Sequence, residues 1–268
     1  MTGQASWYFV NGLQMVLFPT VLILMLGVTP SNYGLAQVSL LAPSIFLIVL
    51  GGTIADKTDT RILLSIVHFL ASLPLLLILL AIQFNFLSFG VMIIYGLAMG
   101  SISAFAIPSR DALLTTISQG DIQKTVVIAM LTQFGFQLTG MAVGGLADIV
   151  GVIPLIIAQG FSLIIGGYFA LRLPKPAIAK APLNIKKIKD EIIEAFIEVR
   201  KSKEIFPVSI SMIMVGLCFM GNNLVTLPYI TTERYGLGAS GFATVSTCFW
   251  LGTFFSNSIL ALNKNLKN

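Results

Sequence analysis

The feature that most limits how this chain can fold is a series of eight apolar runs, each long enough to cross a lipid bilayer. About 20 predominantly apolar residues in a helix span the ~30 Å hydrocarbon layer. Backbone groups inside lipid must be hydrogen-bonded within their own segment, so each run is predicted to be a transmembrane helix. The runs lie at residues 6–28, 34–55, 62–82, 87–107, 125–147, 151–171, 206–230 and 239–262. The fold class that follows is an all-α membrane protein.

The composition excludes a water-soluble protein. Only 10% of the 268 residues are charged and 56% are apolar, whereas a soluble domain is about 25% charged. The net charge of +5 would suit a nucleic-acid partner, but the basic residues lie between the apolar runs. The lipid bilayer, and not nucleic acid, is therefore the predicted partner.

The distribution of basic residues predicts the orientation of the chain. If the N-terminus is cytoplasmic, 15 of the 16 Lys and Arg residues lie in cytoplasmic segments, and only Arg234 lies outside. Cytoplasmic loops of membrane proteins carry such an excess of basic residues. We expect an integral protein of a bacterial-type plasma (inner) membrane with both termini cytoplasmic.

The spacing of the runs divides the chain into three regions. Residues 1–172 form a predicted six-helix bundle, 173–205 a cytoplasmic linker, and 206–268 the first two helices of a second, incomplete bundle. Apolar residues recur in the linker at helical spacing, which predicts an amphipathic helix on the membrane surface. That helix serves either as a tether or as a lipid- or partner-binding segment. Its apolar stripe consists of Ile185, Ile188, Ile192, Phe196 and Val199.

The connection between the second and third runs carries a signature. A glycine is followed by Ala-Asp-Lys and a further basic residue, and the matching positions are Gly52, Asp56, Lys57 and Arg61. This pattern resembles the conformational-switch loop of the major facilitator superfamily. Asp59 and Thr60 depart from the general pattern, and an Asp at that position is found in the branch that resembles the enterobactin exporter. The alternative interpretation is an ordinary charged turn beside the membrane.

A second motif lies in the fifth run, where Gly140, Gly144 and Gly145 are spaced as in the glycine motif of exporters of that superfamily. Met141 replaces the usual proline of that motif. Small residues four apart allow two membrane helices to approach closely. The motif therefore indicates either exporter-like bending of this helix or helix packing alone.

A third similarity covers Pro108 to Leu114, which resemble the Pro-x-x-x-Ala-Leu-Leu segment of the enterobactin exporter branch. It places Arg110 and Asp111 in a second cytoplasmic loop. The resemblance to the superfamily runs along the chain to about residue 262. It implies a major facilitator-type bundle of twelve helices, of which this chain would hold eight. A truncated transporter is expected, and a second chain that supplies the other four helices is a candidate partner.

Polar residues at bilayer depth are the candidates for a substrate pathway, although each also suits hydrogen bonding between helices. They are Asn11, Gln14, Tyr95, Gln133, Gln137, Asn222 and Asn223. His68, in the third run, either titrates or is a packed histidine.

The resemblance favours a secondary active transporter that exports an unidentified small molecule by alternating access. The alternative is a truncated, non-transporting membrane protein, either a remnant or half of a split transporter. An intramembrane enzyme is disfavoured, because the runs contain no pattern of a nucleophile with a base or of clustered acids. Neither a cofactor nor a metal is expected.

Overall fold

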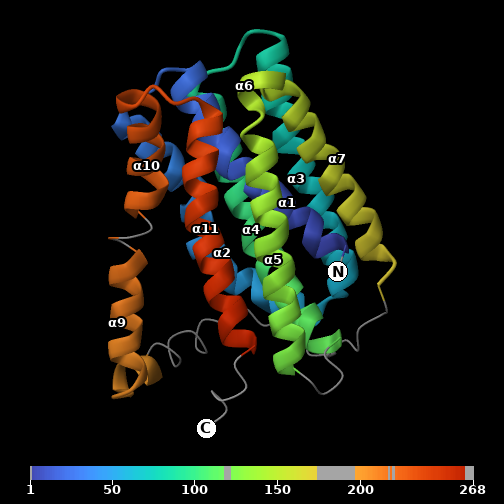
Figure 1. Cartoon of the computed structure of the whole chain (residues 1–268). Coiled ribbons are helices and arrows are strands. Elements are labelled where there is room, and N and C mark those ends of the chain that lie inside the picture. The colour runs from blue at the N-terminus through green and yellow to red at the C-terminus, as the bar shows by residue number, and fades with distance from the viewer. Residues whose placement is uncertain (1, 118–121, 174–196, 217, 219–220, 263–268) are drawn as a thin grey trace.

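The computed structural model describes residues 2–117, 122–173, 197–216, 218 and 221–262, and these residues are helical or in turns, with no strand among them. Seven helices form the N-terminal bundle (Figure 1). They are α1 (Thr2–Pro19, continued by the π-helix η1, Thr20–Met25), α2 (Pro30–Lys57), α3 (Thr60–Gln83), α4 (Phe89–Ile117), α5 (Ile122–Gly144), the short α6 (Ala147–Val150) and α7 (Val152–Leu171).

The remaining described residues form the C-terminal part. It consists of α9 (Ile205–Val215), η3 (Asn222–Thr226), α10 (Leu227–Tyr229), η4 (Ile230–Arg234) and α11 (Ala239–Leu262). The connecting residues 174–196 contain most of the predicted amphipathic stripe and lie outside the described residues. Val199 belongs to a short helical stretch at 197–201.

Six described helices are long and apolar enough to cross a membrane, and they match the first six predicted runs. The prediction of eight spans is therefore supported for six. The run 206–230 is not one uninterrupted helix in the described chain, because α9 ends at Val215 and shorter helical pieces follow. Residues 217 and 219–220 within that run lie outside the description, and α11 is not among the six.

Proline explains part of this irregularity. In an α-helix the N–H of residue 228 would bond to the carbonyl of Leu224, but Pro228 has no N–H. The Leu224 carbonyl instead accepts hydrogen bonds from α2, from the Tyr33 hydroxyl at 3.1 Å and the Gln37 amide at 3.4 Å. The missing N–H of Pro228 thus leaves the Leu224 carbonyl as an acceptor that joins the C-terminal part to the N-terminal bundle.

The bundle has two ends, which we name by a residue at each. At the Lys57 end, α2 is followed by α3 and α4 runs to Ile117; at the Asp148 end, α5 is followed by α6 and α7. Helix α1 lies beside both α5 and α7, α2 beside α4, and α3 beside both α4 and α7, while α11 packs against α5 (Figure 1).

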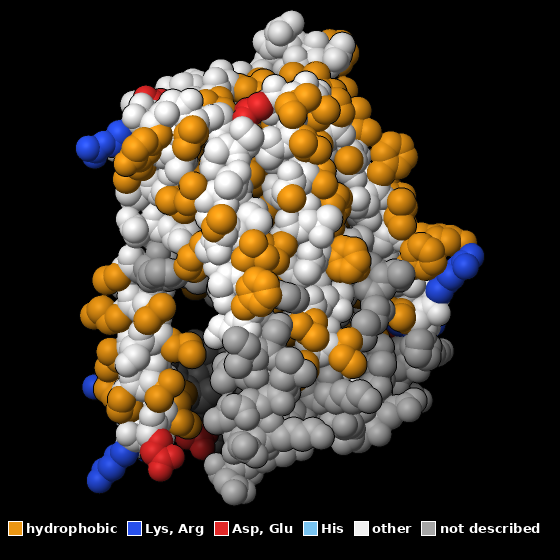
Figure 2. All heavy atoms as spheres, viewed as in Figure 1, with side chains coloured by type: hydrophobic (Ala, Val, Ile, Leu, Met, Phe, Trp, Pro, Cys, Tyr) orange, Lys and Arg blue, Asp and Glu red, His pale blue; other side chains and the backbone are white. Residues whose placement is uncertain are grey.

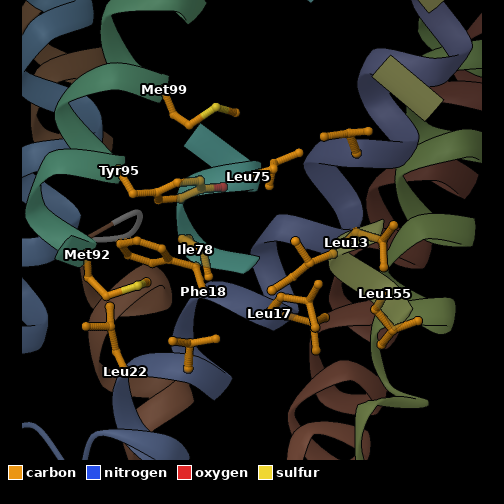
Figure 3. Close-up of a cluster of buried hydrophobic side chains, with 14 of the residues drawn as sticks. Leu13, Leu17, Phe18, Leu22, Leu75, Ile78, Met92, Tyr95, Met99 and Leu155 are labelled. Atoms are coloured by element: carbon orange, nitrogen blue, oxygen red, sulfur yellow. The ribbon is translucent and has the colours of Figure 1, made fainter. Parts of the chain in front are cut away.

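A continuous hydrophobic core holds these helices together. Figure 3 shows side chains of α1, α3 and α4 around Phe18 and Tyr95, whose rings stack with centroids 6.1 Å apart, and Leu155 of α7 farther from these rings in the same cluster. Burial of such side chains stabilises a protein by roughly 1.5–3 kcal/mol each in water, whereas close packing is the main contribution between helices in lipid. Other labelled members of the cluster are Leu13, Leu17, Leu22, Leu75, Ile78, Met92, Met99 and Leu155.

The outer surface is apolar as well. Phe46 on α2 and Ile149 at the Asp148 end are each about four-fifths exposed, and Figure 2 shows hydrophobic side chains along the described part of one face. Exposed apolar surface on this scale is unfavourable in water and is the surface expected of a protein embedded in lipid.

Candidate functional site

A central cavity of about 420 Å³ lies between the N-terminal bundle and the C-terminal part. Its walls come from α1, α2, α4, α5, η3, α10 and α11, so both parts of the chain contribute. A volume in this range is typical of sites for small organic molecules.

Amide side chains predicted from the sequence form part of the wall. Five of the seven candidate pathway residues line the cavity: Asn11, Gln14, Gln133, Gln137 and Asn223. Gln137 lies on α5 and donates to the Met15 sulfur of α1 at 3.2 Å. Amides donate and accept hydrogen bonds without carrying charge, so this wall suits polar, uncharged parts of a ligand.

The other two candidates lie elsewhere. The Tyr95 side chain is buried in the hydrophobic core beside Phe18, and Asn222 is exposed. Neighbouring residues on a helix point about 100° apart, and of Asn222 and Asn223 only Asn223 lines the cavity. Hydropathy alone does not distinguish the faces of a helix that is apolar all round.

Aromatic residues line the rest of the cavity, including Trp7, Tyr8, Phe242 and Trp250. The Trp7 ring meets His68 edge-on, with centroids 5.3 Å apart. Trp250 on α11 lies 6.1 Å from Phe134 on α5, measured between ring centroids. Aromatic rings beside amides suit an amphipathic ligand with a flat or branched apolar body.

The prediction that Arg110 and Asp111 lie in a cytoplasmic loop is wrong, because both residues lie within α4. The helix continues through Pro108, and the Ser109 hydroxyl donates to the Phe105 carbonyl at 2.6 Å. The Arg110 side chain therefore faces the bundle interior, where it lines the central cavity and is only 14% exposed. The Asp111 side chain is 61% exposed.

A second void of about 260 Å³ lies beside the central cavity toward the Lys57 end. Tyr8, Arg110 and Gln133 line both spaces. The Arg110 guanidinium lies 4.7 Å from the centre of the Tyr8 ring, a cation–π contact. The two voids thus adjoin at the cationic side chain of Arg110, for which the sequence pattern predicts a place outside the helices.

In the conformational-switch loop the signature includes Gly52, but the glycine that lies closely against another helix is its neighbour Gly51. A Cβ on Gly51 would overlap the Ala104 carbonyl oxygen of α4, whereas one on Gly52 would meet only the Pro108 side chain at 4.0 Å. Asp56 is exposed, and Lys57 is the last residue of α2.

Asp59, which departs from the general pattern, has a clear structural role. Its carboxylate begins α3 by accepting from the Arg61 backbone N–H at 3.0 Å, and it also binds the Arg61 guanidinium at 3.0 and 2.7 Å. The Arg61 hydrogen bonds, from the side chain first, hold the pKa of Asp59 below its usual value. Arg61 also donates to the Leu173 carbonyl at 3.0 Å and so connects α3 to the end of α7.

The glycine motif of α5 lies at helix contacts. A Cβ on Gly140 would overlap the Phe9 carbonyl of α1, and one on Gly144 would lie 2.8 Å from the Val16 Cβ. Gly145 faces α11, where a Cβ would lie 2.9 Å from the Ala243 Cβ. The close helix approach that small residues allow is therefore present at all three glycines.

Three contacts that the sequence did not suggest close the cavity toward the Asp148 end. The Tyr33 hydroxyl donates to the Leu224 carbonyl, as described above, and the Tyr229 hydroxyl donates to the Val28 carbonyl at 3.0 Å. The Asp148 carboxylate accepts from the first two N–H groups of α11, those of Ala239 at 2.9 Å and Ser240 at 2.8 Å. An anion at a helix N-terminus is favourable.

His68 has the geometry of a packed histidine. It is fully buried, with its Nδ1 2.7 Å from the Leu64 carbonyl and its Nε2 3.1 Å from the Gly3 carbonyl of α1. The His68 side chain also lies close to the glycines of α7. A Cβ added at Gly166 would be only 2.8 Å from the His68 ring. The histidine therefore joins three helices and lies outside the lining of the central cavity.

Comparison with known proteins adds the family. No curated protein matches the chain. The family model of the Major Facilitator Superfamily, a family of membrane transporters, matches residues 1–264, which is nearly the whole sequence. Together with six apolar helices of membrane length and a cavity that two parts of the chain share, this match shows that the chain is an integral membrane protein that belongs to the Major Facilitator Superfamily.

Proposed function

We propose that the chain is a secondary active transporter that exports small molecules by alternating access. The observation that carries the proposal is the central cavity, which both parts of the chain line. At the Asp148 end, hydrogen bonds join the N-terminal bundle to the C-terminal part. A site between two bodies that are joined at one end is the geometry that rocking requires.

The contacts at the Asp148 end also touch the cavity. Tyr33, Gln37 and Leu224 form the hydrogen bonds between α2 and η3, and all three line the cavity. A ligand that binds there changes the surroundings of the groups that hold this end closed. Differential contact of a ligand with two states is what shifts an equilibrium between them.

At the opposite end α9 lies apart from the N-terminal bundle, whereas α11 packs against α5. None of the α9 residues is buried by the described chain, and Figure 2 shows a gap between α9 and the nearest described side chains beside it. The second void, beside Arg110, lies at this same end. These features support a state in which the cavity opens toward the Lys57 end.

The distribution of basic residues supports a cytoplasmic location for the Lys57 end, in a bacterial-type plasma membrane with both termini inside. The glycine motif and the resemblance to the enterobactin exporter branch support export as the direction. Within this proposal the loop residues Gly52, Asp56, Lys57 and Arg61 act as a conformational switch at the cytoplasmic surface.

Inside-out membrane vesicles test the proposal. Energised vesicles that contain the protein should accumulate at least one member of a panel of neutral, anionic and cationic fluorescent amphiphiles, and an ionophore should abolish the accumulation. Ser246→Trp, which fills the cavity from α11, should abolish it too. Thr244→Trp changes an exposed position of the same helix and should have no effect. Accumulation equal to that of vesicles without the protein would refute the proposal.

The second candidate is a non-transporting protein, a remnant or half of a split transporter. It is supported by α9, whose apolar residues, such as Met212 at 72% exposure, lie uncovered by the described chain. Lipid or the helices of a second chain would cover them. Ionophore-sensitive accumulation by this chain alone, purified and reconstituted without a second chain, would exclude this candidate.

A further inference from the structure

We infer that the cavity takes an amphipathic molecule with one anionic group, such as a carboxylate, and that Arg110 binds this group. The inference rests on the proposed function and deepens it by naming the class of substrate. It starts from charge, because Arg110 is the one charged side chain among the described residues that line the central cavity. The one other charged residue on the described lining of the two adjoining voids is Asp111.

The surroundings of Arg110 leave its guanidinium available to an anion. Within the described chain it contacts the Asp111 carboxylate at 3.5 Å and the face of the Tyr8 ring at 4.7 Å. A strong charge-assisted hydrogen bond is shorter, about 2.7–2.9 Å, and a ring face accepts no directed bond from most of the five N–H groups of arginine. The exposed Asp111 therefore meets only part of the hydrogen-bonding capacity of the Arg110 guanidinium.

The position of Arg110 fixes how a ligand would lie. Arg110 stands where the two voids adjoin, beside Tyr8 and Gln133, and the aromatic residues Phe242 and Trp250 line the central cavity. An anionic group at Arg110 places the apolar body of a ligand among these rings. The planar guanidinium matches a carboxylate with two parallel hydrogen bonds, and no acid of the described lining of the central cavity offers a site for a cationic group.

Tryptophan fluorescence gives a direct reading of occupancy, because the chain has two tryptophans and both Trp7 and Trp250 line the cavity. The full chain in lipid nanodiscs is titrated with 4-tert-butylbenzoate and with its neutral analogue, 4-tert-butylbenzamide. We expect a saturable change with the benzoate, at an affinity about tenfold or more higher than with the benzamide, since a charged hydrogen bond adds about 1.5–3 kcal/mol.

Three variants sharpen the test. Arg110→Gln should reduce the affinity for the benzoate to that for the benzamide, while benzamide binding itself shows that the variant is folded. Arg110→Lys should keep part of the preference. Arg172→Gln is the matched control, because Arg172 lies 4.7 Å over the Tyr168 ring but outside the cavity, and it should bind both probes as the wild type does.

Equal affinity of the wild type for the two probes, undiminished benzoate binding by Arg110→Gln, or the absence of saturable benzoate binding would each overturn the inference. These outcomes are separate from the fate of the proposed function. Vesicles that accumulate neutral and anionic amphiphiles equally would retain the transporter and reject the role of Arg110. Benzoate-selective binding without accumulation of any amphiphile would retain the site and reject transport.

Discussion

Two adjacent glycines at the Lys57 end of α2 show how strongly helix packing depends on a single position. Gly51 lies against the backbone of α4, while Gly52 has space around it. The superfamily pattern points to Gly52, but which of two neighbouring residues faces another helix depends on the rotation of α2 in the bundle, and that rotation is set by packing partners far away in the sequence.

Alanine substitutions at these two glycines should therefore have opposite effects. Gly51→Ala forces α2 and α4 apart and should lower the free energy of unfolding by about 1–3 kcal/mol. Gly52→Ala should leave stability unchanged or raise it by up to ~1 kcal/mol, because alanine favours the helix. Thermal denaturation in detergent compares the two variants. Equal midpoints would mean that the contact at Gly51 is not tight.

Asp59 gives a prediction about pH. Its pKa is lower in the folded protein than in the unfolded chain, chiefly through its hydrogen bonds with Arg61. Its stabilisation is therefore complete above the unfolded value of about 3.9 and is lost as the pH falls through the lower folded-state value. Asp59→Asn should be less stable than the wild type at pH 7, and this difference should shrink as the pH is lowered below ~4. A constant difference would argue against the ion pair.

At the scale of helices, the contact between Asp148 and the start of α11 connects the two parts of the chain without a covalent link. The carboxylate caps two N–H groups that have no partner inside α11. The fifth and eighth apolar runs, and an acid near the end of the fifth, are evident in the sequence. The contact between this acid and the eighth run is not evident in the sequence, because it joins residues about 90 positions apart.

Loss of the charge at this contact should loosen the Asp148 end. Asp148→Asn weakens a charge–helix interaction of about 1 kcal/mol, so the population with this end open should rise about fivefold. Spin labels at the exposed Ile149 and Tyr235 report the separation between α6 and the C-terminal part. The control, Glu233→Gln, removes an exposed acid at the same end. Identical distance distributions for wild type and Asp148→Asn would show that the contact does not hold this end.

For the whole molecule, the sequence predicts the membrane-length helices, because these depend on long apolar stretches. It does not predict the position of Arg110, because this depends on which helix faces pack together. The first six runs coincide with membrane-length helices, and five of seven pathway residues face one cavity. Arg110 was misplaced because the polar residues Ser109 to Asp111 after Pro108 have the composition of a loop. The α-helix nevertheless continues to Ile117, and on it Arg110 lines the interior voids and lies over the Tyr8 ring.

The orientation of the molecule in the membrane is the property on which the direction of transport depends. Fifteen of the 16 basic residues are cytoplasmic if the Lys57 end faces inward, and moving them across would oppose the positive-inside rule. A reporter active only in the cytoplasm should therefore give a signal when fused after Lys203, which precedes α9. The same reporter fused after Arg234, which ends η4 near the Asp148 end, should be silent. The reverse pair of signals would mean that the molecule has the opposite orientation in the membrane. The cavity in this state would then open to the outside, and export could not begin from it.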